Sequence, residues 1–119
     1  MSASPSTVTA AALLARLPGK VTPQWPEGER SVVGLAHGTM SVRLFAPRGT
    51  DHQRPHAQDE VYFVIAGHGT FVLDGQRHPF EPGTAFFVGA GVPHRFEDFS
   101  PDFATWVVFW GPQGGEQAA

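Results

Sequence analysis

The chain contains no cysteine, and charged residues are sparse. The lack of cysteine excludes disulfides, thiolate metal sites and cysteine nucleophiles. Charged residues make up 16% of the 119 residues, the net charge is −3, and no basic cluster stands out. Neither nucleic acid nor an anionic membrane surface is therefore expected as a partner. The apolar stretch Ala10 to Leu14 is too short to span a bilayer and lacks a basic leader. We expect a single-domain cytoplasmic protein.

The two ends of the chain differ in composition from its centre. Thr7 or Thr9 can cap a short helix that runs to Leu17, where a Pro-Gly pair stops it. Within this N-terminal part, residues 1–30, the segment from Pro18 to Arg30 carries three prolines and predicts an irregular connector. Residues 112–119 are mostly Gly, Gln and Ala and predict a flexible tail.

Residues 31–111 form a series of short strand-like runs separated by Gly and Pro. Asp74-Gly75 is a strong signal for a two-residue hairpin turn, because both positions tolerate positive φ. Many short strands at regular spacing are typical of an all-β sandwich or barrel. The predicted strands are Ser31–Ala36, Met40–Ala46, Glu60–Ala66, Gly69–Leu73, Gln76–Phe80, Ala85–Val88, His94–Asp98 and Ala104–Trp110.

Two of the six histidines occupy informative positions. His56 lies four residues before Glu60, and in an extended strand both side chains fall on the same face. His94 follows a glycine-rich turn and begins a strand. Imidazole and carboxylate together suit divalent metals and leave coordination positions open. Spacing alone is also typical of a solvated strand edge, so both interpretations stay open. His52, in a polar loop, could reach the same site.

The last strand alternates two apolar faces, from Phe103 through Trp110. A central strand buried on both sides explains this pattern. If one face instead lies on the outside, it forms an apolar patch that a second subunit can cover. We therefore expect a homodimer.

Two stretches resemble the paired motifs of the cupin superfamily. The segment from Glu60 to Gly67 is similar to the E-x6-G end of the first motif, and Gly83 to His94 is similar to the second, with His94 in the histidine position. The resemblance covers about half of the chain. It implies an all-β, antiparallel jelly-roll β-barrel with a short N-terminal helix, often dimeric, whose motif residues point into the lumen. It places Tyr62 inside the barrel, and Phe96 is a further candidate for the lumen.

The sequence departs from the family pattern at the ligands. If the first motif is aligned on Glu60, His56 stands at its second histidine position and Arg54 at its first. If it is aligned on His56 as the first histidine, Gln58 stands at the second position. Either way one of the three usual histidines is missing. The Glu60 anchor keeps the spacing to Gly67 and is favoured. The resemblance then implies His56, Glu60 and His94 as metal ligands. Gln58 or His52 is the candidate fourth donor.

These ligands imply a divalent ion, Fe, Mn, Ni or Zn, whose identity the sequence leaves open. The first hypothesis is a metal-dependent enzyme of oxygenase or isomerase type that acts on a small organic molecule, positioned by Tyr62 or Gln58. The alternative is a non-enzymatic module that binds or senses a small molecule. A structural interaction protein ranks last, because it leaves the placement of the three ligands to chance.

Overall fold

The computed structural model describes residues 5–117 and contains one helix and eight strands within them. The helix α1 spans Ala10–Leu14, and Thr9 caps it by accepting a hydrogen bond from the Ala12 N–H. It is shorter than the sequence predicts, because a turn replaces it after Leu14. No helix in this part of the chain is long and apolar enough to cross a membrane. The cytoplasmic location stays a prediction.

The strands agree with the sequence prediction to within about one residue at each end. Both residues of the Asp74-Gly75 turn have positive φ, 49° and 83°, as the predicted hairpin requires. The strands are β1 (Ser31–His37), β2 (Met40–Phe45), β3 (Asp59–Ala66), β4 (Gly69–Leu73), β5 (Gln76–Phe80), β6 (Ala85–Val88), β7 (His94–Glu97) and β8 (Ala104–Trp110).

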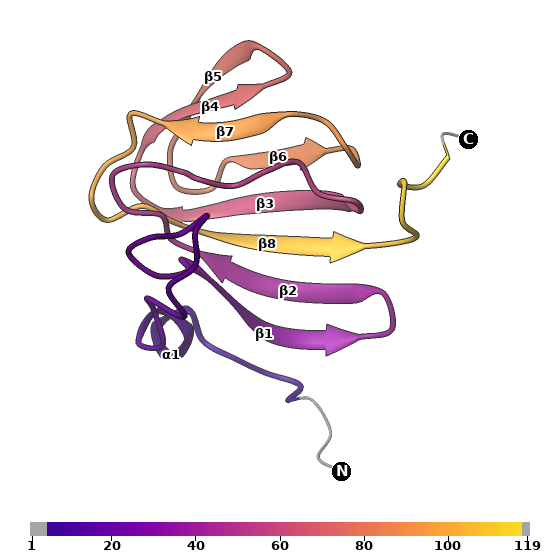
Figure 1. Ribbon diagram of the computed structural model, residues 1–119, viewed down its shortest axis with the longest axis horizontal. Coiled ribbons are helices and arrows are strands. Elements are labelled where there is room, and N and C mark those ends of the chain that lie inside the picture. Colours follow the sequence, from indigo (N-terminus) through magenta and orange to yellow (C-terminus); the bar gives the residue numbers. More distant parts are fainter. Residues whose placement is uncertain (1–4, 118–119) are drawn as a thin grey trace.

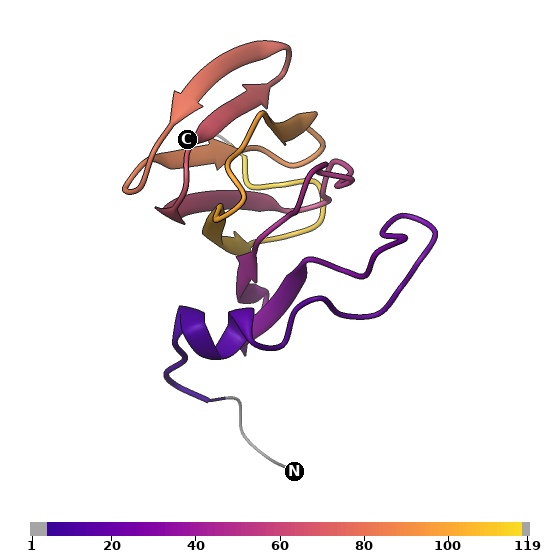
Figure 2. The ribbon, with the colours of Figure 1, turned by 90° about the vertical axis from the view of Figure 1, so that its left-hand side faces the viewer.

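The strands form two antiparallel sheets with a jelly-roll arrangement (Figures 1 and 2). The larger has the order β1-β2-β8-β3-β6 and the smaller the order β5-β4-β7. The all-β jelly-roll prediction is confirmed, but the closed barrel is wrong, because the edge strands of one sheet do not pair with those of the other. A strand pattern along the sequence predicts which segments are extended. It does not predict which strands pair at the edges of the sheets, since the strands that would have to pair are distant in the chain.

The core joins side chains from both sheets and is mainly aromatic. Neighbouring rings meet edge-on or tilted, as for Tyr62 against Phe96 at 5.1 Å and Phe96 against Phe103 at 4.7 Å. Packing of this kind holds β3 and β7 together and so fixes the two strands that carry Glu60 and His94. The buried core residues are Phe45, Tyr62, Val64, Phe71, Phe80, Val88, Phe96, Phe103, Val107 and Phe109.

The helix covers one part of the outer face of the larger sheet. Leu13 is buried, and its Cδ1 lies 2.7 Å from where a Cβ on Gly34 of β1 would stand, so only glycine allows this close approach. Over β3 and β6 the outer face is open: Phe63, Ile65 and Phe87 are 46%, 37% and 59% exposed. In the last strand, β8, Val107 and Phe109 lie in the core, whereas Trp106, Val108 and Trp110 on the other face are half-buried, so one face lies in the core and one outside it.

The segment after β8 is partly fixed to the rest of the fold. Gly114 N donates to Ala57 O at 2.7 Å, and Glu116 N donates to the buried Asp59 carboxylate at 2.8 Å. Residues 118 and 119 of the predicted tail lie outside the described residues.

Candidate metal centre

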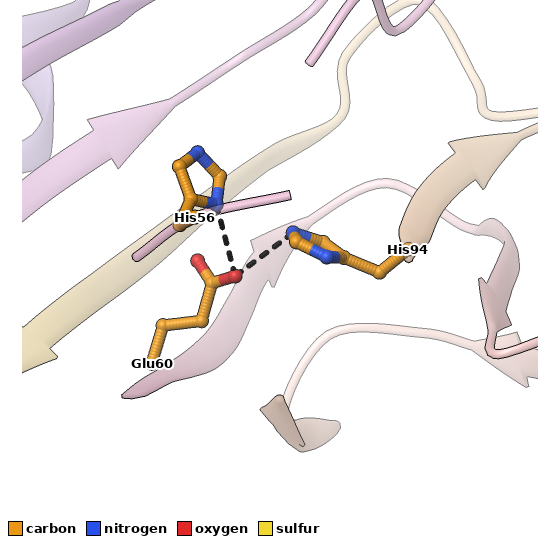
Figure 3. A group of neighbouring side chains, drawn as sticks. All are labelled: His56, Glu60 and His94. Atoms are coloured by element: carbon orange, nitrogen blue, oxygen red, sulfur yellow. Dashed lines mark hydrogen bonds and ion pairs between the residues drawn. The ribbon is translucent and has the colours of Figure 1, made fainter. Parts of the chain in front are cut away.

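Three residues from separate segments converge on one point (Figure 3). Glu60 is in β3, His94 begins β7, and His56 lies in the loop between β2 and β3. Each offers one donor atom, and the three atoms lie within 4.8 Å of one another. Glu60 Oε1 is 2.8 Å from His94 Nε2 and 3.1 Å from His56 Nδ1. The structure therefore brings together the three residues that the sequence predicts as ligands.

Loop contacts hold the two histidines in place. The backbone oxygen of His56 accepts a hydrogen bond from Gly91 N at 2.7 Å, which ties its loop to the turn before β7. His94 Nδ1 lies 2.9 Å from the backbone oxygen of Val92. A carbonyl only accepts, so Nδ1 carries the proton and Nε2 is the atom turned to Glu60. A hydrogen bond of this kind, on the far nitrogen, is how proteins orient a metal-binding imidazole.

Glu60 and His94 are both buried, and each perturbs the protonation of the other. Burial raises the pKa of Glu60, but the hydrogen bonds from His56 and His94 outweigh it and leave the pKa below its ordinary value. Burial lowers the pKa of His94, but the hydrogen bond and the charge of Glu60, with the Val92 carbonyl, raise it overall. Without a metal, both shifts favour the charged forms, so between pH 4.5 and pH 6.5 this pair is a carboxylate beside an imidazolium.

The second oxygen of Glu60 provides a test of whether a cation fits. Glu60 is 1% exposed, and its Oε2 is buried with no hydrogen-bond partner among the described residues. A buried carboxylate oxygen without a partner is costly, and native proteins rarely leave one. Two imidazole nitrogens and a carboxylate also match the ligand preferences of Fe, Mn, Ni and Zn. The residues present fit a divalent ion.

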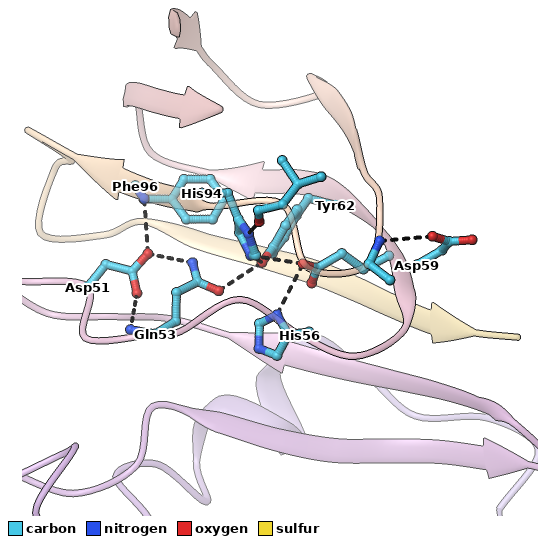
Figure 4. Close-up of polar contacts among 10 residues, drawn as sticks. Asp51, Gln53, His56, Asp59, Tyr62, His94 and Phe96 are labelled. Carbon is cyan, nitrogen blue, oxygen red and sulfur yellow. Dashed lines mark hydrogen bonds and ion pairs between the residues drawn. The ribbon is translucent and has the colours of Figure 1, made fainter. Parts of the chain in front are cut away.

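A chain of hydrogen bonds supports the cluster from the core side (Figure 4). The Tyr62 hydroxyl lies 3.1 Å from His94 Nε2 and donates to Gln53 Oε1 at 3.0 Å. The Gln53 amide in turn donates to the Asp51 carboxylate, which also accepts from Phe96 N at 2.9 Å. Burial and the charges of Glu60 and Asp51 raise the pKa of Tyr62 well above its ordinary value, so Tyr62 stays protonated.

Sequence reasoning missed Asp51 and Gln53. Neither belongs to a motif, and the loop around them has no periodicity that would indicate burial. Asp51 is nevertheless buried, and burial raises its pKa despite the hydrogen bonds from Phe96 and Gln53 that oppose the rise. The contact that reveals its role is the hydrogen bond from Phe96 N of β7, which lies 45 residues further along the chain.

The other predicted residues lie in different places. The Gln58 amide donates to the backbone oxygens of Thr39 and Gly111. The His52 ring meets Trp25 at 5.3 Å and borders a separate small cavity. Phe96 packs in the aromatic core, whereas Tyr62 borders the main cavity.

The main cavity has a volume of about 550 Å³, which is in the range of small-ligand sites. It lies along the inner face of β2, β8 and β3 and is bordered by the N-terminal connector. Of the three clustered residues only His56, with 34% of its side chain exposed, lines this cavity; Glu60 and His94 are buried, and His94 borders a second, smaller cavity. Gln53 and Tyr62 line the cavity beside His56.

Comparison with known proteins defines the class. A family model, that of the cupin domain, matches residues 41–110, which include all three clustered residues. The chain therefore belongs to the cupin family. An uncharacterised protein of Streptomyces coelicolor is 41% identical over 81 residues, 66% of this chain and 77% of that protein.

One further relative and one solved structure are matched over less of their own length. A mannose-6-phosphate isomerase of Candida glabrata is 41% identical over 49 residues, which are 41% of this chain and 11% of the isomerase. The crystal structure of the DMSP lyase DddQ from Ruegeria pomeroyi superposes with a TM-score of 0.59 at 22% identity, over 68% of this chain and 46% of the lyase. The structural match establishes a common fold.

Proposed function

We propose that this cupin binds a divalent metal ion through His56, Glu60 and His94 and acts on a small organic molecule in the adjacent cavity. The observation that carries the proposal is the buried Glu60 Oε2, which has no partner among the described residues although two imidazoles contact the other oxygen. A bound ion would supply a Lewis acid that polarises a substrate oxygen.

The residues around the cluster have defined roles in this proposal. His56 presents the site to the cavity, and the Tyr62 hydroxyl, whose proton is donated to Gln53, offers its oxygen to accept a hydrogen bond that orients the substrate. The isomerase relative, and the lyase that shares the fold, favour a non-hydrolytic reaction. An isomerase-type or oxygenase-type reaction is consistent with two histidines and one carboxylate.

Metal analysis tests the proposal. Full-length protein is stripped with a chelator, incubated separately with Fe(II), Mn, Ni and Zn, desalted and analysed for bound metal. We expect near-stoichiometric retention of at least one ion, and loss of retention in His56→Ala and His94→Ala. His37→Ala, an exposed histidine at the end of β1, is the matched control. Because His94 is buried, circular dichroism checks that its variant is folded. A parent protein that retains no metal after supplementation refutes the proposal.

A second candidate function is a metal-free module that binds or senses a small molecule. The contacts of Glu60 with both histidines favour it, because the cluster already forms an ion pair without a metal. This candidate predicts thermal stabilisation by a ligand in chelator-treated protein, with no turnover.

We further propose that the protein is a homodimer. The exposed Phe63, Ile65 and Phe87 on the outer face of β3 and β6 support this assembly. Partly buried Trp106 and Trp110 of the neighbouring β8 extend the apolar area. A second copy of the same face is the occupant that covers such a patch in a symmetric dimer.

A further inference from the structure

The charges that border the main cavity are mostly positive. Arg16, Arg30 and Arg43 line it, while Glu29 is the one carboxylate among its lining residues. Within the described part of the chain, none of the three arginines lies within 4.0 Å of a carboxylate oxygen. Guanidinium groups that face a cavity without an acidic partner favour an anionic ligand there.

Arg43 is the arginine placed on the inner face of the larger sheet. It lies on β2 directly opposite Val107 of β8, which in turn is opposite Tyr62 of β3. Its Nε donates to Ser41 Oγ at 3.2 Å, which orients the guanidinium. Its terminal amino groups make no hydrogen bond or ion pair within residues 5–117, so they are available to bind an anion in a bidentate manner.

One aromatic ring connects Arg43 to the metal centre. The Arg43 guanidinium carbon lies 4.8 Å from the centroid of the Phe109 ring, and the His56 ring centroid lies 4.8 Å from the same point. The two groups are therefore separated by at most twice this distance. A molecule with a chain of a few carbon atoms can contact both.

Arg30 adds positive charge at the connector end of the cavity. Its Nε donates to Ala46 O at 2.7 Å, so its position is fixed as well. Burial lowers the pKa of Arg30, and the charge of Arg48 lowers it further. An anion in the cavity would offset the repulsion between the positive charges of Arg30 and Arg48.

The rest of the wall is apolar. Trp25, Phe45, Val107 and Phe109 line the space between the arginines and His56. Aromatic and branched side chains bury the carbon skeleton of a ligand, while a small number of polar groups fix its orientation. The combination selects an organic molecule with an acidic group rather than an inorganic anion.

We propose that the cavity takes a small organic anion, with its carboxylate or phosphate group on Arg43, its carbon skeleton against Phe45 and Phe109, and its opposite end at His56. The placement of that opposite end rests on the proposed function. Binding of the anionic group by Arg43 does not require the metal. The substrate class of this cupin would then be organic acids or phosphate esters.

Calorimetric titration of chelator-treated, full-length protein tests the anion site. The probes are 3-phenylpropionate, phenyl phosphate and the neutral 3-phenylpropionamide. At least one anion is expected to bind about tenfold or more tightly than the amide, because a charge-assisted bidentate contact is lost with the neutral group. Comparison of the carboxylate with the phosphate identifies which acidic group the site accepts.

Variants of Arg43 separate a specific contact from general charge. Arg43→Gln is expected to remove the preference for the anion, and Arg43→Lys to retain only part of it, since lysine lacks the planar fork. Arg95→Gln, an exposed arginine on β7 outside this cavity, is the control with the same change in charge and is expected to keep the full preference. Unfolding curves verify that each variant is folded.

The proposal is overturned if the parent protein binds neither anion, if it binds the amide as tightly, or if Arg43→Gln keeps the preference. Metal retention is measured on the same preparations. A protein that retains no metal but prefers the anion through Arg43 refutes the metal-dependent function and leaves the anion site standing. A protein that retains metal without any preference for the anion refutes the anion site and leaves the metal-dependent function standing.

Discussion

Glu60→Gln, made in protein freed of metal by a chelator, tests the buried ion pair. Glu60 Oε1 contacts His94 at 2.8 Å and His56 at 3.1 Å. A hydrogen bond to a charged group contributes about 1.5–3 kcal/mol, roughly twice a neutral one. Glutamine keeps an acceptor but loses the charge, and its NH2 group replaces an oxygen that has no partner within residues 5–117. Removing the buried charge offsets part of this loss. We expect the free energy of unfolding to fall by roughly 2 kcal/mol at mildly acidic pH.

The size of this effect depends on pH. The pKa of His94 is raised above 6.5, so its charged form stabilises the fold fully below pH 6.5, and this contribution is lost as pH rises through the folded-state pKa. The pKa of Glu60 is lowered below 4.5, so its contribution is present above pH 4.5 and is lost as pH falls through the folded-state pKa. The ion pair therefore stabilises the metal-free protein most between these two values.

Urea unfolding followed by circular dichroism measures the difference between parent and variant at about pH 5.5 and about pH 9. Glu81→Gln, an exposed residue after β5, is the control and is expected to change stability by less than about 0.5 kcal/mol. The ion-pair argument fails if Glu60→Gln is as stable as the parent at pH 5.5. It also fails if the difference is as large at pH 9.

Three further changes have defined outcomes. Tyr62→Phe leaves Gln53 Oε1 without its donor and is expected to lower the free energy of unfolding by about 1–2 kcal/mol in urea titrations; an unchanged midpoint would contradict the hydrogen-bond chain. Gly67→Ala is expected to lower the free energy of unfolding by roughly 2–4 kcal/mol, because φ is 86° and the new Cβ would lie 2.6 Å from a backbone atom of Phe103, just before β8. Gly75→Ala has a similar φ of 83° but open space around the new Cβ, so it measures the cost of the positive φ alone and is expected to be milder. Phe87→Asp is expected to convert the proposed dimer to a monomer in light scattering with unchanged metal content, and a monomeric parent would refute the dimer.

The strands and the three clustered residues were predictable because their signals are local. Alternation of apolar residues and Gly-Pro punctuation identified eight strands to within about one residue at each end. The hairpin at Asp74-Gly75 follows from the φ values that only a few residue types adopt readily. The resemblance to the cupin motifs then identified His56, Glu60 and His94 as the residues that meet.

The tertiary structure alone decided the surroundings of the site. Asp51 and Gln53 look like ordinary loop residues, and they become buried supports of the site only because the loop packs against β7. Arg43 reads as one polar residue of a strand until the sheet order places it across β8 from Tyr62.

The sequence by itself determined the strands, the family and the three clustered residues, since propensity and side-chain alternation act between near neighbours in the chain. It did not determine that the sheets stay open, that Gln58 and His52 lie outside the cluster, or that three arginines border one cavity. These features depend on contacts between segments distant in the chain, and such contacts exist only after the two sheets have packed.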